Sequence, residues 1–155
     1  MAVDVKKAYF YAPAIRPIFI HIPAEDRTPE DAGKVARLNL RFYGTRGAAE
    51  NLANTLTQFL NQCGFTTGRA SLRNFCHAER DMVLTVHGND FTVSGSTANL
   101  RWMKKGFKRR FEVTAHTLGT EVGQEREVRI LNRVIRWTPE LRIRTRPAAR
   151  GDRNP

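Results

Sequence analysis

The feature that most constrains the fold is a run of three short apolar segments between residues 72 and 93. The segments cover 72–77, 82–86 and 91–93, and two tight polar connections, Ala-Glu-Arg-Asp and His-Gly-Asn-Asp, separate them. Gly and Asn tolerate positive φ, so the second connection on its own is an ordinary hairpin turn. Segments this short with turns this tight predict three antiparallel strands in a meander.

An amphipathic helix is predicted on each side of this meander. Before it, apolar residues recur at steps of three and four, which places them on one face of a helix. These residues are Ala49, Leu52, Ala53, Leu56, Phe59 and Leu60. Gly64 follows the last of them and predicts the end of that helix. A second helix is expected over about 97–110, with an apolar face formed by Leu100, Met103 and Phe107.

Further strands complete the predicted fold. They are expected at 2–5, 17–23, 34–40, 111–115 and 127–137, with a polar loop at 24–33. This order of elements predicts an α+β fold, in which two helices pack on one face of an antiparallel sheet. From Thr138 the chain is rich in Pro and Arg and poor in apolar residues. We therefore expect one domain over 1–137 and a flexible basic tail over 138–155.

Charge is the strongest global signal. The 155 residues include 26 Lys and Arg against 15 Asp and Glu, a net charge of +11. Residues 101–155 hold 15 of the basic and 6 of the acidic side chains, a net charge of +9. This balance suits a polyanionic partner, most often nucleic acid, and the alternative is a merely solubilising surface.

The sequence also predicts a compartment. No apolar run approaches the roughly 18 residues of a membrane span, and no secretory signal is present. Cys63 and Cys76 show neither disulfide nor metal-ligand spacing. We expect an intracellular protein, cytoplasmic or nuclear, that is not secreted and has no membrane partner.

Three local features carry potential chemistry. Asp4 lies inside an apolar strand, where a carboxylate is costly unless it is solvated, paired or bound to a metal. Asn89 and Asp90 end the hairpin turn, and Tyr43-Gly44-Thr45-Arg46 precedes the first helix. Taken singly, these features indicate only an edge-strand aspartate, a common turn and a plain loop.

In this order and at these separations, the same features resemble a known enzyme family. Asp4-Val5-Lys6-Lys7-Ala8-Tyr9 resembles the first palm motif of copia-type reverse transcriptases. Arg37-Leu38-Asn39 followed by Tyr43-Gly44-Thr45-Arg46 is similar to the stretch before their nucleotide-contacting helix. The run from Leu84 to Gly95 resembles their catalytic hairpin, and the helix at 97–110 with Phe111-Glu112-Val113 is similar to the segment after that hairpin. The resemblance covers roughly residues 2–137.

This resemblance implies an RNA-directed DNA polymerase site. The family holds two Mg²⁺ ions between carboxylates of the first strand and the hairpin. Asp4 and Asp90 would be the catalytic and metal-binding residues, and Tyr9 would exclude the 2′-hydroxyl of a ribonucleotide. Tyr43, Gly44 and Arg46 would contact the deoxynucleoside triphosphate.

The implied macromolecular partners are an RNA template and a DNA primer, or their hybrid. The basic face of the second helix and the tail arginines from Arg142 to Arg153 would lie near that backbone. The residues of the helix face are Arg101, Lys104, Lys105, Lys108 and Arg109. The resemblance also implies that fingers, a full thumb and an RNase H domain are missing from this stretch.

One departure from the family pattern bears directly on activity. Asn89 stands where the family has the first hairpin aspartate, and an amide brings no negative charge to a site for two dications. Metal-based charge stabilisation is worth several kcal/mol, and each ~1.4 kcal/mol is about tenfold in rate. The degenerate position and the missing parts predict an inactive fragment.

Two other functions remain open from the sequence. One is a non-catalytic nucleic-acid-binding remnant or domesticated module, which Asn89 favours. The other is a small basic structural component of a ribonucleoprotein that shares this order of elements by coincidence. The placement of Asp4 and Asp90 at motif positions argues against the second.

Overall fold

The computed structural model describes residues 1–14, 16–40, 42, 44, 47–138 and 143–147. The chain divides into two compact units, which are described separately. Unit 1 comprises Met1–Lys6 and Thr57–Pro155, and unit 2 comprises Lys7–Leu56. The fold class is α+β, as predicted, with two helices and antiparallel sheets. Within the described residues, no helix is long and apolar enough to span a membrane.

A six-stranded antiparallel sheet forms the framework of unit 1, in the order β4-β5-β6-β7-β1-β8. The predicted meander is its larger part, since β5, β6 and β7 follow one another through tight turns. The short helix η4 (Ala78–Arg80) lies between β5 and β6. The strands are β1 (Ala2–Val5), β4 (Thr66–Thr67), β5 (Asn74–His77), β6 (Met82–His87), β7 (Asp90–Ser94) and β8 (Val113–His116).

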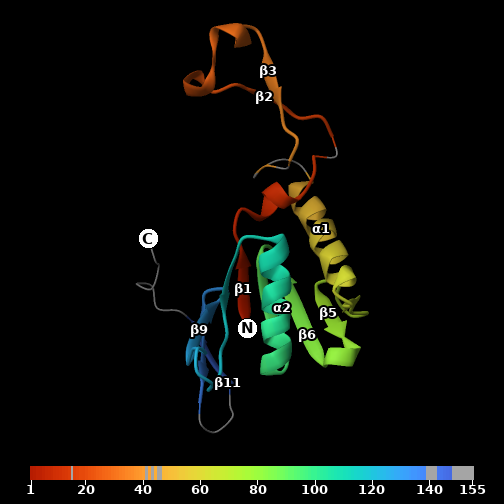
Figure 1. The fold of residues 1–155 in the computed structure, drawn as a ribbon, viewed down its shortest axis with the longest axis vertical. Coiled ribbons are helices and arrows are strands. Elements are labelled where there is room, and N and C mark those ends of the chain that lie inside the picture. The colour runs from red at the N-terminus through yellow and green to blue at the C-terminus, as the bar shows by residue number, and fades with distance from the viewer. Residues whose placement is uncertain (15, 41, 43, 45–46, 139–142, 148–155) are drawn as a thin grey trace. The chain divides into compact units, whose positions relative to one another are not determined.

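The helix α2 (Thr97–Arg110) covers one face of this sheet (Figure 1). It begins after Ser96, whose hydroxyl accepts a hydrogen bond from the backbone N–H of Asn99, a standard N-cap. Its apolar residues are buried, and the ring of Phe107 lies 4.9 Å from that of Phe91 on β7. The predicted bounds and apolar face of this helix are therefore confirmed.

The helix α1 (Ala48–Gln62) ends as its sequence predicts. Gly64 has a φ of 88°, the Phe65 N–H donates to the Leu60 carbonyl, and the Gly64 N–H donates to that of Asn61. This pair of bonds is a Schellman motif, for which glycine is the favoured residue. In unit 1 the last turns of α1 lie beside α2, because the ring of Phe59 is 5.4 Å from that of Phe107.

The region after β8 differs from the prediction. The single strand expected at 127–137 is a hairpin of β9 (Glu127–Ile130) and β10 (Arg133–Trp137). Leu131 and Asn132 both have positive φ, as the two-residue type I′ turn requires. Residues 143–147 form β11 (Ile143–Pro147), which pairs with β10, so the expectation of an unstructured tail is wrong for this segment. The open edge of β10 supplies the backbone partners for it.

Unit 2 contains little buried apolar surface. Its small hairpin pairs β2 (Phe19–His21) with β3 (Val35–Arg37), within the segments predicted as strands. The 3-10 helices η1 (Ala8–Tyr11), η2 (Ala24–Asp26) and η3 (Pro29–Asp31) make up most of its other regular structure before α1. Its buried hydrophobic residues are Ala8, Ala12, Ala48, Leu52 and Leu56.

Candidate functional site

Four side chains lie in one row across β6, β7, β1 and β8, at the turn end of the β6–β7 hairpin. Asp4 on β1 is directly opposite Asp90 on β7 and, on its other side, Thr114 on β8. Asp90 is in turn opposite His87 on β6. Side chains directly opposite one another in antiparallel strands have Cβ atoms about 4.5–5.5 Å apart. The structure therefore brings together the two carboxylates that the sequence predicted as metal ligands.

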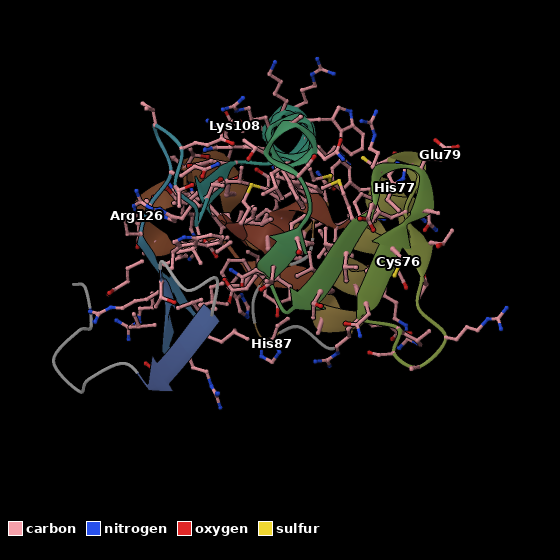
Figure 2. All side chains as sticks on the ribbon, turned by 90° about the horizontal axis from the view of Figure 1, so that it is seen from below. Cys76, His77, Glu79, His87, Lys108 and Arg126 are labelled. Carbon is pink, nitrogen blue, oxygen red and sulfur yellow. The ribbon has the colours of Figure 1, made fainter. Side chains whose placement is uncertain are left out.

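This row lies on the face of the sheet that α2 does not cover. Phe91 and Val93 point toward α2 and are 1% exposed, and alternation along β7 places Asp90 and Thr92 on the opposite face. Figure 2 shows the same division, with Lys108 of α2 on one side of the sheet and His87 on the other. Asp4 and Asp90 are both half-buried, so each side chain is partly accessible to solvent.

Asn89 closes the hairpin onto β1. Its side-chain Nδ2 donates a hydrogen bond of 2.6 Å to Oδ1 of Asp4, and its carbonyl accepts one of 3.0 Å from the Val5 N–H. An ionised carboxylate can only accept hydrogen bonds, so the amide must present its NH₂ group to Asp4. An aspartate at position 89 could make this contact only through a shared proton or a cation.

The electrostatics of the row centre on Asp90. Partial burial and the neighbouring Asp4 carboxylate raise the pKa of the Asp90 carboxyl, and the His87 side chain opposes that shift. A neighbouring carboxylate disfavours ionisation of Asp90, and a cation beside the pair would relieve that cost. The arrangement is thus one that favours binding of a cation or a proton.

A cavity of about 260 Å³ opens beside the two carboxylates. Its lining comes from four strands and from the β9–β10 turn. The polar side chains in the lining are Asp4, Asp90, Thr114, His116 and Arg129. The imidazole Nδ1 of His116 lies 2.6 Å from a carboxylate oxygen of Glu125, which fixes the ring at the rim. The cavity combines acidic and basic groups, as a site for a cation with an anionic ligand requires.

The donor set fits one Mg²⁺ ion better than two. Mg²⁺ is commonly held by one or two carboxylates with water and substrate phosphates completing its shell, and Asp4 and Asp90 supply those two. Among the described residues, no group of three or more His, Cys, Asp or Glu side chains could hold a metal. The amide of Asn89 donates to Asp4 and brings no third carboxylate.

The five basic residues predicted on α2 divide into two groups. Arg101 forms an ion pair of 3.0 Å with Glu121, and the ammonium of Lys104 donates to the Ala115 carbonyl at 3.3 Å. The remaining three are exposed on the outer side of the helix, away from the sheet. They are Lys105, Lys108 and Arg109. The helix face and the carboxylates therefore lie on opposite sides of the sheet, and the structure does not bring them together.

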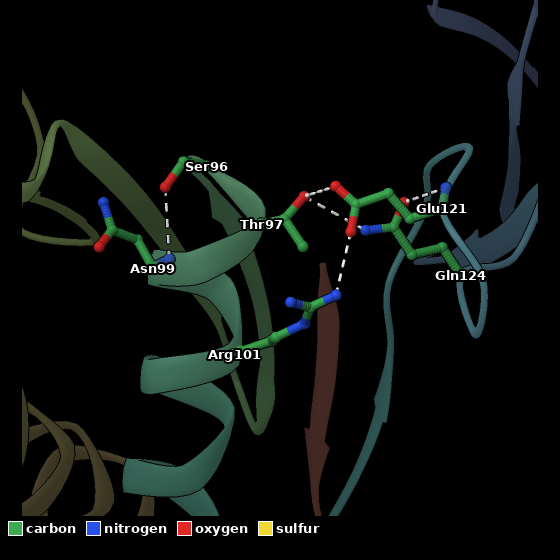
Figure 3. A network of polar contacts seen from close by, with 6 residues as sticks. All are labelled: Ser96, Thr97, Asn99, Arg101, Glu121 and Gln124. Carbon is green, nitrogen blue, oxygen red and sulfur yellow. Dashed lines mark hydrogen bonds and ion pairs between the residues drawn. The ribbon is translucent and has the colours of Figure 1, made fainter.

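Figure 3 shows how the loop after β8 is fixed against α2. Glu121 accepts hydrogen bonds from the Thr97 hydroxyl at 2.8 Å and from Arg101 at 3.0 Å. Gln124 accepts a bond from the Glu121 N–H and donates to Thr97. Arg101 is thus partly neutralised by this loop before any external anion binds.

The residues predicted to contact the nucleotide belong to unit 2. Tyr9 lies in η1 and is half-buried, and Gly44 is exposed with a φ of 79°. Tyr43 and Arg46 lie outside the described residues. The roles assigned to these four residues stay predictions.

Sequence reasoning missed part of the cavity. Thr114, His116 and Arg129 line it, yet none of them belongs to the motifs that indicated the carboxylates. The alternation of polar and apolar residues in 127–130 gives a weak signal for Arg129, because it places that side chain and Val128 on opposite faces of β9. Nothing in the sequence indicates that β9 folds over Asp4.

The sequence matches the family model described as Reverse transcriptase (RNA-dependent DNA polymerase) over residues 1–134. A search of curated proteins finds no match.

Proposed function

Because this chain belongs to the reverse transcriptase (RNA-dependent DNA polymerase) family, we propose that Asp4 and Asp90 are the remnant of its nucleotidyl-transfer site. The observation that carries the proposal is their direct opposition on the face of the sheet that α2 does not cover, beside a cavity. The motifs around them favour the copia-type branch of the family. The proposed partners are an RNA template, a DNA primer and deoxynucleoside triphosphates.

In this proposal Asp4 and Asp90 hold a single Mg²⁺ ion. Bound there, the ion would supply positive charge to the phosphates of an incoming nucleotide. Arg129 at the cavity wall adds a second positive group on the same side, and Thr114 offers a hydroxyl. Tyr9 is proposed to select deoxynucleotides, as its motif position implies.

We propose that Asn89 weakens catalysis by donating a hydrogen bond to a carboxylate oxygen of Asp4. The 2.6 Å hydrogen bond uses an oxygen of Asp4 that a second cation would need, and the amide adds no charge of its own. Loss of one hard anionic ligand removes several kcal/mol of charge stabilisation from a site of this kind. We expect no measurable primer extension by this chain on a poly(A) template with Mg²⁺.

The same hydrogen bond favours a second candidate function. A member of the family that no longer holds metal could persist as a nucleic-acid-binding protein, and Asn89 stabilises Asp4 without any ion. The two candidates differ in whether the carboxylate pair binds Mg²⁺ at millimolar concentrations.

The substitution Asn89→Asp tests the proposal directly. It removes the hydrogen bond to Asp4 and adds a like charge, so the metal-free protein should lose stability. In return, Mg²⁺ should bind more tightly, and at 100 times its dissociation constant it should restore about 2.7 kcal/mol. Thermal unfolding with increasing Mg²⁺ measures both effects, and the unchanged chain should show a smaller shift.

The control is the double substitution Asn89→Asp with Asp4→Asn, which keeps the net charge of the unchanged chain. Its unfolding temperature should not respond to Mg²⁺ beyond the effect of ionic strength, which Na⁺ at matched ionic strength reports. If Mg²⁺ raised the unfolding temperature of this control as much as that of Asn89→Asp, Asp4 would not be a ligand of the ion. Primer extension by the unchanged chain would show instead that Asn89 does not impair catalysis.

A further inference from the structure

The outer side of α2 is strongly basic. The helix carries six basic side chains and no acidic one between Thr97 and Arg110. Its apolar residues, Leu100, Met103 and Phe107, face the sheet. At 100° per residue, Lys105 and Arg109 lie opposite that apolar stripe, and Lys108 lies on the flank between those two residues and the stripe. A solvated helix face usually mixes both signs of charge in i,i+4 pairs, and this one does not.

Three of these cations are available to an external anion. Arg101 is engaged by Glu121, and Lys104 donates to the Ala115 carbonyl. Lys105, Lys108 and Arg109, hereafter the helix cations, are exposed, and no ion pair or hydrogen bond engages their side chains within the described part of the chain. The hydrogen bonds and ion pair of Arg101 and Lys104 anchor α2 to the loop and to β8. The sixth basic residue, Arg110, lies with its guanidinium 5.7 Å from the centroid of the Phe111 ring.

A purely stabilising role explains only part of this pattern. Cations in the last turn interact favourably with the helix dipole, which accounts for Lys108 and Arg109. That effect falls off within the last turn, so it does not account for Lys105 in the middle of the helix. It also does not require the helix to lack acidic residues.

A cation from outside the helix, Arg80, lies beside its first turns. The guanidinium of Arg80 lies 4.1 Å from the centroid of the Trp102 ring, and its NH1 donates to the Asn99 side chain at 3.3 Å. The rings of Trp102 and His77 are also in contact, nearly perpendicular to each other with centroids 5.8 Å apart. The indole of Trp102 is therefore already stacked against Arg80. A ligand on this surface would be bound by charged groups and not by stacking on the indole.

We propose that the helix cations form a second nucleic-acid site, which binds a phosphate backbone independently of sequence. Membership of the reverse transcriptase family favours nucleic acid over an acidic protein as the polyanion. From Lys105 to Arg109 the helix rises about 6 Å, close to two nucleotide steps of about 3.4 Å along one strand. Arginine and lysine are the usual donors in backbone contacts that carry no sequence information.

This site is separate from the carboxylate cavity. Phe107 of α2 packs against Phe91, while Asp90 beside it points to the other face of the sheet. A helix about 10 Å across and the sheet itself lie between the two surfaces. The stretch of nucleic acid that binds the helix cations would therefore differ from the stretch that reaches Asp4. The protein can hold a nucleic acid on one face while the other face remains open.

Binding of the full chain to a fluorescent 20-base-pair RNA–DNA hybrid, titrated with salt, tests the proposal. The helix variant removes three charges: Lys105→Gln, Lys108→Gln and Arg109→Gln. The matched control removes three exposed charges elsewhere in unit 1: Arg69→Gln, Arg73→Gln and Arg126→Gln. The helix variant should lower the slope of log K against log salt by about 2–3 and weaken binding at least about tenfold. The control should change affinity by less than about threefold.

Three further measurements separate this proposal from its alternatives. A charge-preserving variant, Lys105→Arg with Lys108→Arg and Arg109→Lys, should retain binding, and its loss would show that helix damage explains the result. Equal losses of affinity in the helix variant and the matched control would show that binding depends only on net charge. That result would contradict the proposed site. Competition by polyglutamate as effective as that by unlabelled hybrid would assign the surface to an acidic protein instead.

The carboxylate site supplies the last control. The proposed helix site depends on membership of the reverse transcriptase family but not on metal binding by Asp4 and Asp90. Replacing Asp4 and Asp90 with Asn should leave the salt slope for the hybrid unchanged, and a drop equal to that of the helix variant would show one shared site. The Mg²⁺ response of Asn89→Asp should survive the three helix substitutions. Failure of hybrid binding with that response intact would refute the helix site alone.

Discussion

The face of the six-stranded sheet that packs under α2 carries Val3, Leu84 and Phe91, whereas the opposite face carries Asp4, Thr85 and Asp90. Both faces are built from the same strands, and only the alternation of side chains separates them. The residues of the first face are buried and form part of the core. The second face holds two acidic groups close together, and the raised pKa of Asp90 shows that its ionised form is disfavoured there. Stability and potential chemistry are thus divided between the two sides of a single layer.

Neighbouring residues of β6 should show the largest difference between the faces. Leu84 is fully buried and Val83 is 49% exposed on the polar face. Leu84→Ala should lower the free energy of unfolding by about 2–5 kcal/mol, through lost burial and a cavity. Val83→Ala should change it by no more than about 0.5 kcal/mol. Denaturant unfolding of both variants measures the contrast, and similar losses would mean that the two faces are packed alike.

The start of α2 should show an intermediate effect. Ser96→Ala removes the hydroxyl that accepts from the Asn99 N–H, and loss of an N-cap costs about 1 kcal/mol. Ser94→Ala, on the exposed face of β7, is the matched control and should cost less than about half as much. Chemical denaturation gives both values. A larger loss for Ser94 would show that the uncovered face contributes more to stability than its exposure indicates.

Asp90 should show the smallest effect, with the opposite sign. A raised folded-state pKa means that ionised Asp90 costs stability above that pKa, and the cost disappears below the unfolded-state value near 3.9. Asp90→Asn should therefore stabilise the metal-free protein at pH 7.5, by less than about 1 kcal/mol because the group is partly solvated. The gain should shrink toward zero as the pH approaches about 4. Urea unfolding in EDTA at both pH values is the measurement, and a gain independent of pH would exclude this origin.

Local patterns in the sequence predicted the helices and the meander because local interactions determine them. The three- and four-residue spacing in 49–60, with Gly64 after it, is enough to define α1 and its end. Ser96 and the Leu100, Met103 and Phe107 stripe do the same for α2. The hairpin at 131–132 was missed because its first turn residue is leucine, which rarely adopts positive φ.

The arrangement of the site depended on long-range pairing, which no local pattern reports. The motif resemblance predicted that Asp4 and Asp90 belong together, and the register of β1 against β7 agrees with that expectation. It did not predict that β8 and β9 would bring Thr114 and Arg129 to the same cavity. Nor did helical periodicity indicate that the basic side of α2 faces away from the carboxylates, since periodicity fixes one face of a helix and not the sheet face it covers.

The position of β1 between β7 and β8 has a consequence for the order of folding. Asn89 and Asp4 are 85 residues apart, while β5, β6 and β7 pair through turns of a few residues. Non-local pairings form slowly because a long loop must close first, so the meander should form before β1 docks. Native-state hydrogen exchange should find the amides of β1 opening at lower free energy than those of β6. The two carboxylates would then be assembled in the last step of folding and separated in the first step of unfolding, so the metal site would report on an intact sheet.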